Sequence, residues 1–530
     1  MKTGEKVELY DTTLRDGTQA KGVSLSLQDK LTAARMFDEL GVDYIEGGYP
    51  LSNPKDEQFF QEMRKIRLAN ARLAAFGMTR RKATKSADDA GMNALLHSEA
   101  PVVTIVGKTW DMHVKEVLGV SKQENIDMIA ESVAFLAAAG RFVIFDAEHF
   151  FDGYRANMEY ALKTLAAAMD AGAQRLVLCD TNGGTMPEYI SSVVGTVLNA
   201  LPAAKLGIHC HNDCDMAVAN SLAAVNAGII QVQGTINGVG ERCGNADLVS
   251  VSANLALKYG RKVLTEGAIA KLTEVSRGFY ELSNMNFRDN QPYVGSNAFA
   301  HKGGMHVHAV QKISCSYEHV TPETVGNTRR ILVSELAGVS NIAATVPAKF
   351  KLDKDRDAQK KILARVVELE NEGYEFERAE ASFEMVIRET LGGKWYTPLW
   401  KLDHYRCIIL KRDSEKATTE ATVKLAFDDG QTMHTVREGD GPVDSLAGAL
   451  KDALREKYHG LDRLHLMDYR VCVVNTAAET AAKVRVVIDW RSGDKYFGSV
   501  GVGENIIDAS WRAMVDAIEF QLLNDREAAK

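Results

Sequence analysis

Cysteine is scarce in this chain: 7 cysteines occur among 530 residues, an odd number without the paired spacing of a disulfide framework. We therefore expect a reducing compartment, with the cytoplasm as the location. A leader is also missing, because the polar start Met1–Lys6 is followed by no apolar h-region and no Arg/Ser-rich segment. Charged residues or glycines interrupt every apolar run well short of a membrane span. We expect no signal peptide, transit peptide or membrane helix.

A surplus of basic residues is missing too. Lys and Arg total 63 against 71 Asp and Glu, which gives a net charge of -8 and a pI near 6.0. This balance argues against a broad nucleic-acid surface, which needs a basic stripe, but a small anionic ligand needs only a local cluster of donors. What is present is an ordinary globular composition, 45% hydrophobic and 25% charged, in a chain long enough for two or three domains.

Residues 1–265 alternate short apolar runs with longer amphipathic segments. Eight runs, nearly continuous in Val, Ile and Leu, predict buried parallel strands. They are Val7–Asp11, Val42–Glu46, Arg72–Gly77, Val102–Val106, Phe142–Ala147, Leu176–Asp180, Leu206–His211 and Ile229–Ile236. Predicted helices between them, such as Leu27–Leu40, Glu159–Ala171 and Met216–Ala227, are each followed directly by a glycine, as helix C-termini often are. Eight strand–helix units predict an α/β fold, a closed TIM (β/α)8 barrel, rather than a doubly wound sheet.

The chain changes character at about residue 265. Residues 266–400 lose the strand alternation and predict a mostly helical linker region that packs near the barrel mouth. Its clearest element is a polar helix at Asp353–Glu370.

Residues 401–530 predict a C-terminal α+β domain built from two ββα-like repeats. Strands at Glu420–Asp428 and Lys483–Trp490 each lead to a second strand and then to an amphipathic helix, Pro442–Leu454 or Asn505–Leu523. Neither half carries clustered residues suited to chemistry. We interpret the pair as a regulatory, allosteric domain that binds a ligand, with a dimerisation domain alone as the alternative.

Candidate metal-ligating residues lie on predicted strand seven and after predicted strands one and eight. Side chains alternate along a strand, so His209 and His211 project to one face and Cys210 to the other. Asp16 follows strand one, and functional groups of a barrel lie at the carboxyl ends of its strands. With Asn245, from the glycine-rich turn after strand eight, they predict a nitrogen and oxygen site with open positions. Such a site suits Mg²⁺, Mn²⁺, Co²⁺ or Zn²⁺, whereas two core histidines bonded to backbone are the alternative.

Other strand ends supply candidates for substrate binding and proton transfer. A 2-oxo acid could chelate the metal through its carboxylate and keto oxygens, and Arg15 could donate charge-assisted hydrogen bonds to the same oxygens. Glu148, after strand five, is a candidate general acid or base, with a solvated loop carboxylate as the alternative. Thr181, after strand six, is a candidate for binding the substrate carboxylate. No lysine lies near the end of strand six, where Schiff-base aldolases commonly carry one, so the chemistry predicted is metal-based.

Three segments resemble, in order, the signatures of the acyltransferase and lyase barrels that include 2-isopropylmalate synthase, homocitrate synthase and citramalate synthase. They are Asp11–Gln19, Gly207–Leu222 and Asn237–Asn245. Asn297–His306 is similar to the linker motif of the synthases, whose feedback-regulated members also carry a C-terminal repeat domain. Within the group, the chain length and Phe145–Asn157 resemble most the (R)-citramalate synthase branch.

The resemblance implies a Claisen-type condensation of acetyl-CoA with pyruvate and water, giving (R)-citramalate and CoA. This reaction begins a threonine-independent route to isoleucine, with isoleucine as the expected feedback effector and a homodimer as the expected assembly. A 2-isopropylmalate synthase with 2-oxoisovalerate as acceptor is the nearest alternative. A related metal-dependent acyl-CoA lyase and a non-catalytic sensor on an inherited barrel are further alternatives.

The resemblance also assigns expected roles to residues. Arg15 and Thr181 would contact pyruvate, and Glu148 would be the catalytic carboxylate. His306, with Tyr317, would reach the site from the linker as the second candidate base. The expected metal ligands are Asp16, His209, His211 and Asn245.

Two positions depart from the pattern of the synthases. The common Gln-Asp after the linker histidine is replaced by Val307 and His308. Asp146, which we expect in the oxo-acid pocket, stands where several relatives carry an aromatic or a small residue.

Overall fold

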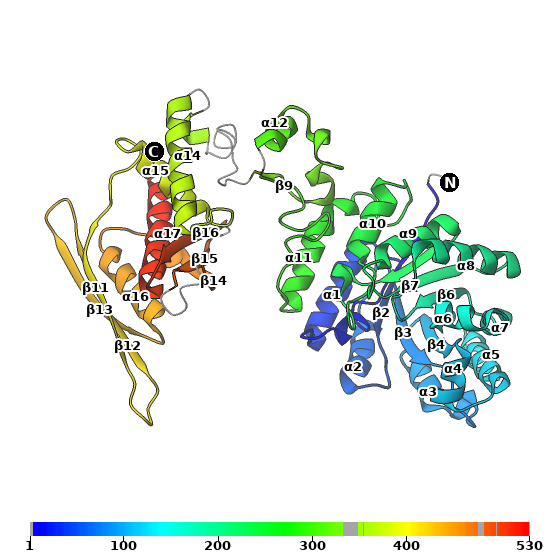
Figure 1. Cartoon of the computed structure of the whole chain (residues 1–530). Helices are drawn as coiled ribbons and strands as arrows, with labels where there is room; N and C mark the ends of the chain where they lie inside the picture. Colours follow the sequence, from blue (N-terminus) through cyan, green and yellow to red (C-terminus); the bar gives the residue numbers. More distant parts are fainter. Residues whose placement is uncertain are drawn as a thin grey trace. The chain divides into compact units, whose positions relative to one another are not determined.

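The computed structural model describes residues 4–302, 304–331, 348–352, 355–474, 482–493 and 495–528. The chain divides into two compact units, each described here by itself (Figure 1). Unit 1 comprises Met1–Phe299 and Glu318–Arg329, and unit 2 comprises Ala300–Tyr317 and Arg330–Lys530. The start of the predicted polar helix, Asp353, and Gly303 of the linker motif lie outside the described residues. None of the helices described is long and apolar enough to cross a membrane.

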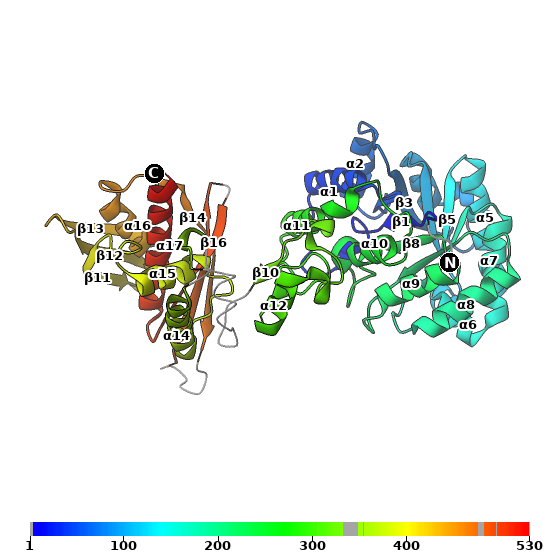
Figure 2. The same ribbon diagram turned by 90° about the horizontal axis from the view of Figure 1, so that it is seen from above.

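Eight parallel strands close into a barrel in unit 1, because β8 pairs with β1 as well as with β7 (Figures 1 and 2). The strands are β1 Glu8–Asp11, β2 Tyr44–Gly48, β3 Arg72–Met78, β4 Val102–Lys108, β5 Phe142–Glu148, β6 Arg175–Asp180, β7 Leu206–Cys210 and β8 Gln231–Gly234. Each overlaps a strand predicted from the sequence. The predicted TIM barrel is confirmed.

Helices cover the outside of the barrel (Figure 2). The helices that follow the strands are α1 Leu27–Leu40, α2 Pro54–Met63, α3 Ala90–His97, α4 Asp111–His113, α5 Lys122–Ala138, α6 Phe150–Ala156, α7 Met158–Asp170, α8 Pro187–Ala200, α9 Ala217–Ala227 and α10 Leu248–Leu257. Local signals explain where they begin and end. A capping box between Ser26 and Asp29 starts α1, and Gly41 ends it in the left-handed conformation at φ 89°.

The alternation of side chains along each strand positions the site. Tyr10, Val102, Ile144 and Val177 belong to a cluster inside the barrel, whereas alternate strand residues such as Phe145 join the core beneath the helices. Polar side chains continue the inner face toward the carboxyl ends of the strands. The site therefore lies at the end of the barrel where the sequence predicted it.

The first part of the predicted linker region belongs to unit 1 and supports the loop after β8. Helix α11, Leu272–Leu282, packs against α1. Asn237 Nδ2 donates to the Ser276 carbonyl oxygen at 2.9 Å, and Gln291 Nε2 donates to Asp247 Oδ2 at 3.0 Å. These bonds fix the turn that carries Asn245.

Unit 2 contains short elements, helices and two antiparallel sheets, each of three strands. They are β9 Ala300–His301, α12 Gly304–Lys312, β10 Arg330–Ile331, α14 Arg356–Glu372, α15 Glu380–Leu391, β11 Lys401–Leu410, β12 Thr418–Ala426, β13 Thr432–Gly439, α16 Pro442–Arg455, β14 Leu464–Val473, β15 Val484–Ser492, β16 Lys495–Gly503 and α17 Ile506–Ala528. Helices α16 and α17 lie between the two sheets and share one apolar core with them (Figure 2).

The two repeats are larger than the sequence predicted. Each is a βββα unit rather than ββα, because β11 precedes β12 and β14 precedes β15. Most residues of these two added strands are exposed. Apolar side chains alternate in each strand, but a bulge between Leu402 and His404 or between Leu466 and Asp468 interrupts the two-residue period, so the hydrophobic pattern did not reveal the strands.

Candidate metal centre and active site

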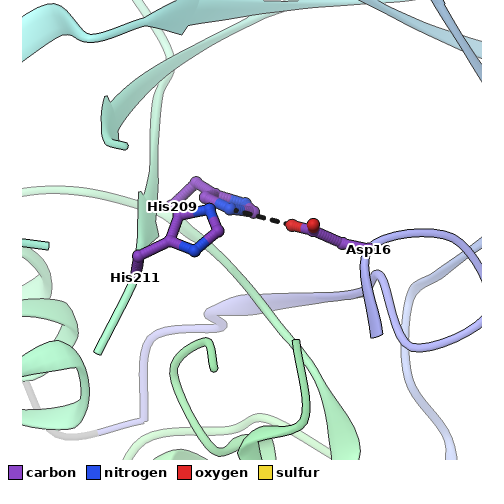
Figure 3. A group of neighbouring side chains, drawn as sticks. All are labelled: Asp16, His209 and His211. Atoms are coloured by element: carbon purple, nitrogen blue, oxygen red, sulfur yellow. Dashed lines mark ion pairs between the residues drawn. The ribbon is translucent and has the colours of Figure 1, made fainter. Parts of the chain in front are cut away.

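Three side chains meet at the carboxyl ends of β1 and β7. Asp16 lies in the loop after β1, His209 lies in β7, and His211 follows β7 directly. One possible ligand atom from each lies within 4.8 Å of the others, and all three residues are buried. His209 Nε2 is 3.3 Å from Asp16 Oδ2 (Figure 3). The structure thus brings together the three residues that the sequence selected. Cys210, which the same alternation turned away, is buried in the outer core.

Unpartnered polar atoms at this cluster fit a divalent cation. Buried His211 Nδ1 and Asn245 Oδ1 have no hydrogen-bond partner among the described residues. Leaving such groups unpaired costs about 1–3 kcal/mol each, which a bound cation would offset. Asn245 Nδ2 donates to Asp16 Oδ2 at 2.8 Å and lies 3.2 Å from His209 Nε2. Rotating this amide by 180° would point Oδ1, instead of Nδ2, toward Asp16 and His209. The donor set of nitrogen and oxygen atoms therefore suits a divalent metal.

The charges of the cluster prepare it for a cation. Burial opposes ionisation of Asp16, but Arg15 and the two histidines outweigh it and hold the pKa of the Asp16 carboxyl well below its usual range. Burial, followed by repulsion from His209, lowers the pKa of His211 to about 4. Burial alone would lower the pKa of His209, but the hydrogen bond and attraction from Asp16 raise it. At neutral pH Asp16 is thus a carboxylate and His211 an uncharged imidazole, the forms that bind metals.

Arg15 is fixed beside the cluster. Its Nε donates to Glu46 Oε1 at 2.6 Å, and its Nη1 lies 3.4 Å from Asp16 Oδ1. The guanidinium carbon is 3.8 Å from the centroid of the Phe76 ring. Tyr10 in turn donates its hydroxyl to Glu46 Oε2 at 2.7 Å. Glu46 therefore anchors the guanidinium. One edge of the group is held by Glu46 and one face lies against Phe76.

Comparison with known proteins identifies the family. The HMGL-like family model matches residues 6–278, the homocitrate synthase post-HMGL domain-like model residues 293–374, and the LeuA allosteric (dimerisation) domain residues 377–522. The (R)-citramalate synthase of Aquifex aeolicus is 49% identical, with 99% of each chain covered, and that of Geobacter sulfurreducens is 48% identical, with 98% of each covered. The chain belongs to the (R)-citramalate synthase family.

Membership in the citramalate synthase family makes this protein an acyltransferase, and it confirms the resemblance found in the sequence. A more distant relative, the probable 2-isopropylmalate synthase of Methanopyrus kandleri, is 33% identical, with 97% of this chain and 98% of the relative covered. The HMGL-like match contains all three barrel motifs, Asp11–Gln19, Gly207–Leu222 and Asn237–Asn245.

In this citramalate synthase family member, Glu148 ends β5 and stands opposite Lys108 at the end of β4. The two form an ion pair, with side chains 24% and 14% exposed. Lys108 was not selected from the sequence. The sequence feature that could have identified Lys108 is its position in β4. It lies six residues after Val102, and because side chains alternate along a strand, both point to the inside of the barrel. Glu148 therefore has a fixed cationic neighbour and partial access to solvent.

Thr181 lies in the loop after β6, at the same end of the barrel. Its Oγ1 accepts a hydrogen bond from the His149 backbone N–H at 2.8 Å. Its carbonyl oxygen accepts from Arg242 Nη2 at 2.7 Å. The Thr181 hydroxyl hydrogen is thus directed away from His149 and can be donated to another group.

Asp146 lies inside the barrel, one inner position below Glu148. It is 3% exposed, and Gln233 Nε2 donates to its Oδ1 at 3.0 Å. Burial, followed by the negative charge of Glu46, raises the pKa of Asp146 to about 7. Gln233 was missed from the sequence, although two glutamines spaced by two in an apolar strand, Gln231 and Gln233, point to polar contacts on the inner face.

His306 and Tyr317, the two site residues that the resemblance drew from the linker, belong to unit 2. Their rings stack with centroids 4.1 Å apart. Tyr317 is 47% exposed. The next two residues, Val307 and His308, are the ones that differ from the synthase pattern. Val307 is 0% exposed, whereas His308 is exposed. The structure therefore places His306 and Tyr317 in contact with each other.

Proposed function

We propose that this protein condenses acetyl-CoA with pyruvate and water to give (R)-citramalate and CoA. The observation that carries the proposal is the buried cluster of Asp16, His209 and His211 beside Arg15, in a chain with citramalate synthases as full-length relatives. The cofactor is a divalent cation, Mg²⁺, Mn²⁺, Co²⁺ or Zn²⁺. Asp16, His209 and His211 would hold it, joined by Asn245 after its amide turns.

Binding of pyruvate falls to residues around the cluster. The bound cation would act as a Lewis acid toward the keto oxygen. Arg15, already oriented by Glu46, donates charge-assisted hydrogen bonds to the oxygens of the oxo acid. Thr181 donates its hydroxyl to the carboxylate, and Asp146 lines the pocket below. The keto carbon would then be electrophilic, and the negative charge that develops on its oxygen during attack would be compensated.

Glu148 is the proposed base. It removes a proton from the methyl group of acetyl-CoA, and the resulting carbon nucleophile forms a bond with the keto carbon of pyruvate. The former keto oxygen takes up a proton, and water then cleaves the thioester and releases CoA. Lys108 holds the Glu148 carboxylate at the barrel mouth through their ion pair. His306 aided by Tyr317 is the second candidate for this base.

A comparison of acceptors tests the reaction. CoA release should be fast with pyruvate and at least about tenfold slower with 2-oxoisovalerate, since the extra methyl groups must fit a pocket sized for a smaller side chain. The measurement is kcat/KM for each oxo acid with acetyl-CoA in a thiol assay, with product identified by mass. A preference for 2-oxoisovalerate would instead assign 2-isopropylmalate synthesis.

We also propose that the protein is a homodimer and that isoleucine binds unit 2 and lowers activity, as feedback on a threonine-independent isoleucine route. The match of residues 377–522 to the LeuA allosteric (dimerisation) domain supports this proposal, as do the two βββα halves. Neither half carries residues that the reaction needs.

Removing that domain should abolish regulation. A chain that ends at Tyr374, between the matches to residues 293–374 and 377–522, should retain condensation activity that no longer responds to isoleucine. This cut removes α15 and exposes the apolar face of α14 that packs against it, so the folding of the shortened chain is checked first by circular dichroism. Activity is measured across an isoleucine series in both chains. Inhibition of the shortened chain would contradict the proposal.

A further inference from the structure

A buried glutamine holds His209 from the side away from Asp16. Gln233 lies in β8, is 0% exposed, and stands opposite His209 in the register of β7 and β8. Its Oε1 is 3.0 Å from His209 Nδ1, and its Nε2 donates to Asp146 Oδ1 at 3.0 Å. The contacts form a continuous path inside the barrel from the candidate metal centre to Asp146.

The two ends of the Gln233 amide differ, and the structure turns the NH₂ end toward Asp146. The NH₂ donates to Asp146 Oδ1, which can accept this bond whether or not the carboxyl group is protonated. The amide carbonyl then faces His209 and can only accept, which places a hydrogen on Nδ1. In the neutral ring the lone pair is therefore on Nε2, the atom that lies 3.3 Å from Asp16 Oδ2.

We propose that Gln233 is a positioning residue of the metal centre, which fixes the hydrogen of His209 on Nδ1 and presents Nε2 to the cation. The inference rests on the metal site proposed above. Hydrogen-bond partners behind metal-binding histidines fix the ring and the tautomer, and their loss commonly lowers metal affinity about 10–100-fold. An amide supplies the acceptor without adding another negative charge beside Asp16, Glu46 and Asp146.

Metal affinity without turnover tests the proposal. Gln233→Leu keeps the approximate volume and removes both hydrogen bonds, so it should raise the Kd for Mn²⁺ about 10–100-fold in the chelator-treated full chain. The measurement is a calorimetric Mn²⁺ titration. Gln231→Leu is the matched control, because Gln231 is also 0% exposed on the inner face of β8 but donates to Glu8 at 3.2 Å. It should bind Mn²⁺ as the unchanged chain does.

A rescue separates positioning from packing. Gln233→Glu keeps an acceptor for His209 but sets a second carboxyl against Asp146, so it should bind Mn²⁺ weakly. Adding Asp146→Asn restores a donor between them, and the double variant should recover most of the lost affinity. If Mn²⁺ affinity recovers only in the double variant, the effect is carried by the hydrogen bonds between residues 233 and 146. A packing effect at residue 233 would not be reversed by a change at residue 146.

The outcomes are distinguishable. Equal Mn²⁺ affinity of the unchanged chain and Gln233→Leu would overturn the role of Gln233 and leave the metal site standing. An equal loss in Gln231→Leu, or no recovery in the double variant, would also overturn it. If the unchanged chain binds no Mn²⁺, or binds it undiminished after Asp16→Asn, the proposed metal site itself fails.

Discussion

Replacing Glu148 with glutamine is expected to lower kcat by about 10²–10⁴-fold, because a positioned general base contributes that much to a proton transfer. The amide keeps the size and part of the polarity of the side chain but cannot take up the proton. Binding should survive, since Arg15 and the metal cluster are separate residues. The measurement is kcat for CoA release, together with the dissociation constant for pyruvate.

The matched control for that substitution is Glu159→Gln. Glu159 is a carboxylate on the outside of the barrel, paired with Lys163 and 79% exposed, so its loss should leave kcat unchanged. Near-normal turnover of Glu148→Gln would remove Glu148 from the role of base. His306→Ala would then be expected to show the loss, with Tyr317 as its stacked partner.

Replacing His211 with alanine is expected to lower metal affinity and kcat/KM by more than about 10²-fold, which exceeds the usual cost of losing a residue behind a ligand. The change removes one of the proposed protein ligands and leaves the cation with fewer donor atoms. Both quantities are measured across a Mn²⁺ series, so that excess metal can be tested as a rescue.

His97→Ala is the control for the loss of an imidazole, because His97 is exposed at the end of α3, and Arg64 contacts its backbone carbonyl oxygen rather than its ring. It should match the unchanged chain in metal affinity and turnover. A His211→Ala variant that stays fully active after chelation would contradict the metal-based mechanism.

Periodicity made the barrel predictable from the sequence. Each strand is buried on both faces, so its apolar run is continuous, and a glycine marks the end of several helices at a positive φ, as at Gly41 and Gly228. The same alternation placed His209 and His211 on one face and turned Cys210 away. Geometry of this kind depends only on spacing along one strand.

Side-chain contacts between different strands could not be predicted from the sequence by this alternation. Glu46, Lys108 and Gln233 act through partners on other strands, and the pairing of their atoms depends on the register of the closed sheet. A single sequence carries no direct signal for that register. The strands β11 and β14 were missed for a different reason, because a bulge near the start of each interrupts its two-residue hydrophobic period.

Locating the metal tests the central claim most directly. Crystals of the protein with Mn²⁺ and pyruvate, measured at the manganese absorption edge, should give an anomalous peak about 2.0–2.3 Å from ligand atoms of Asp16, His209 and His211. Pyruvate oxygens should complete the coordination on the side of Arg15. A manganese peak elsewhere, with those three side chains unliganded, would contradict the mechanism.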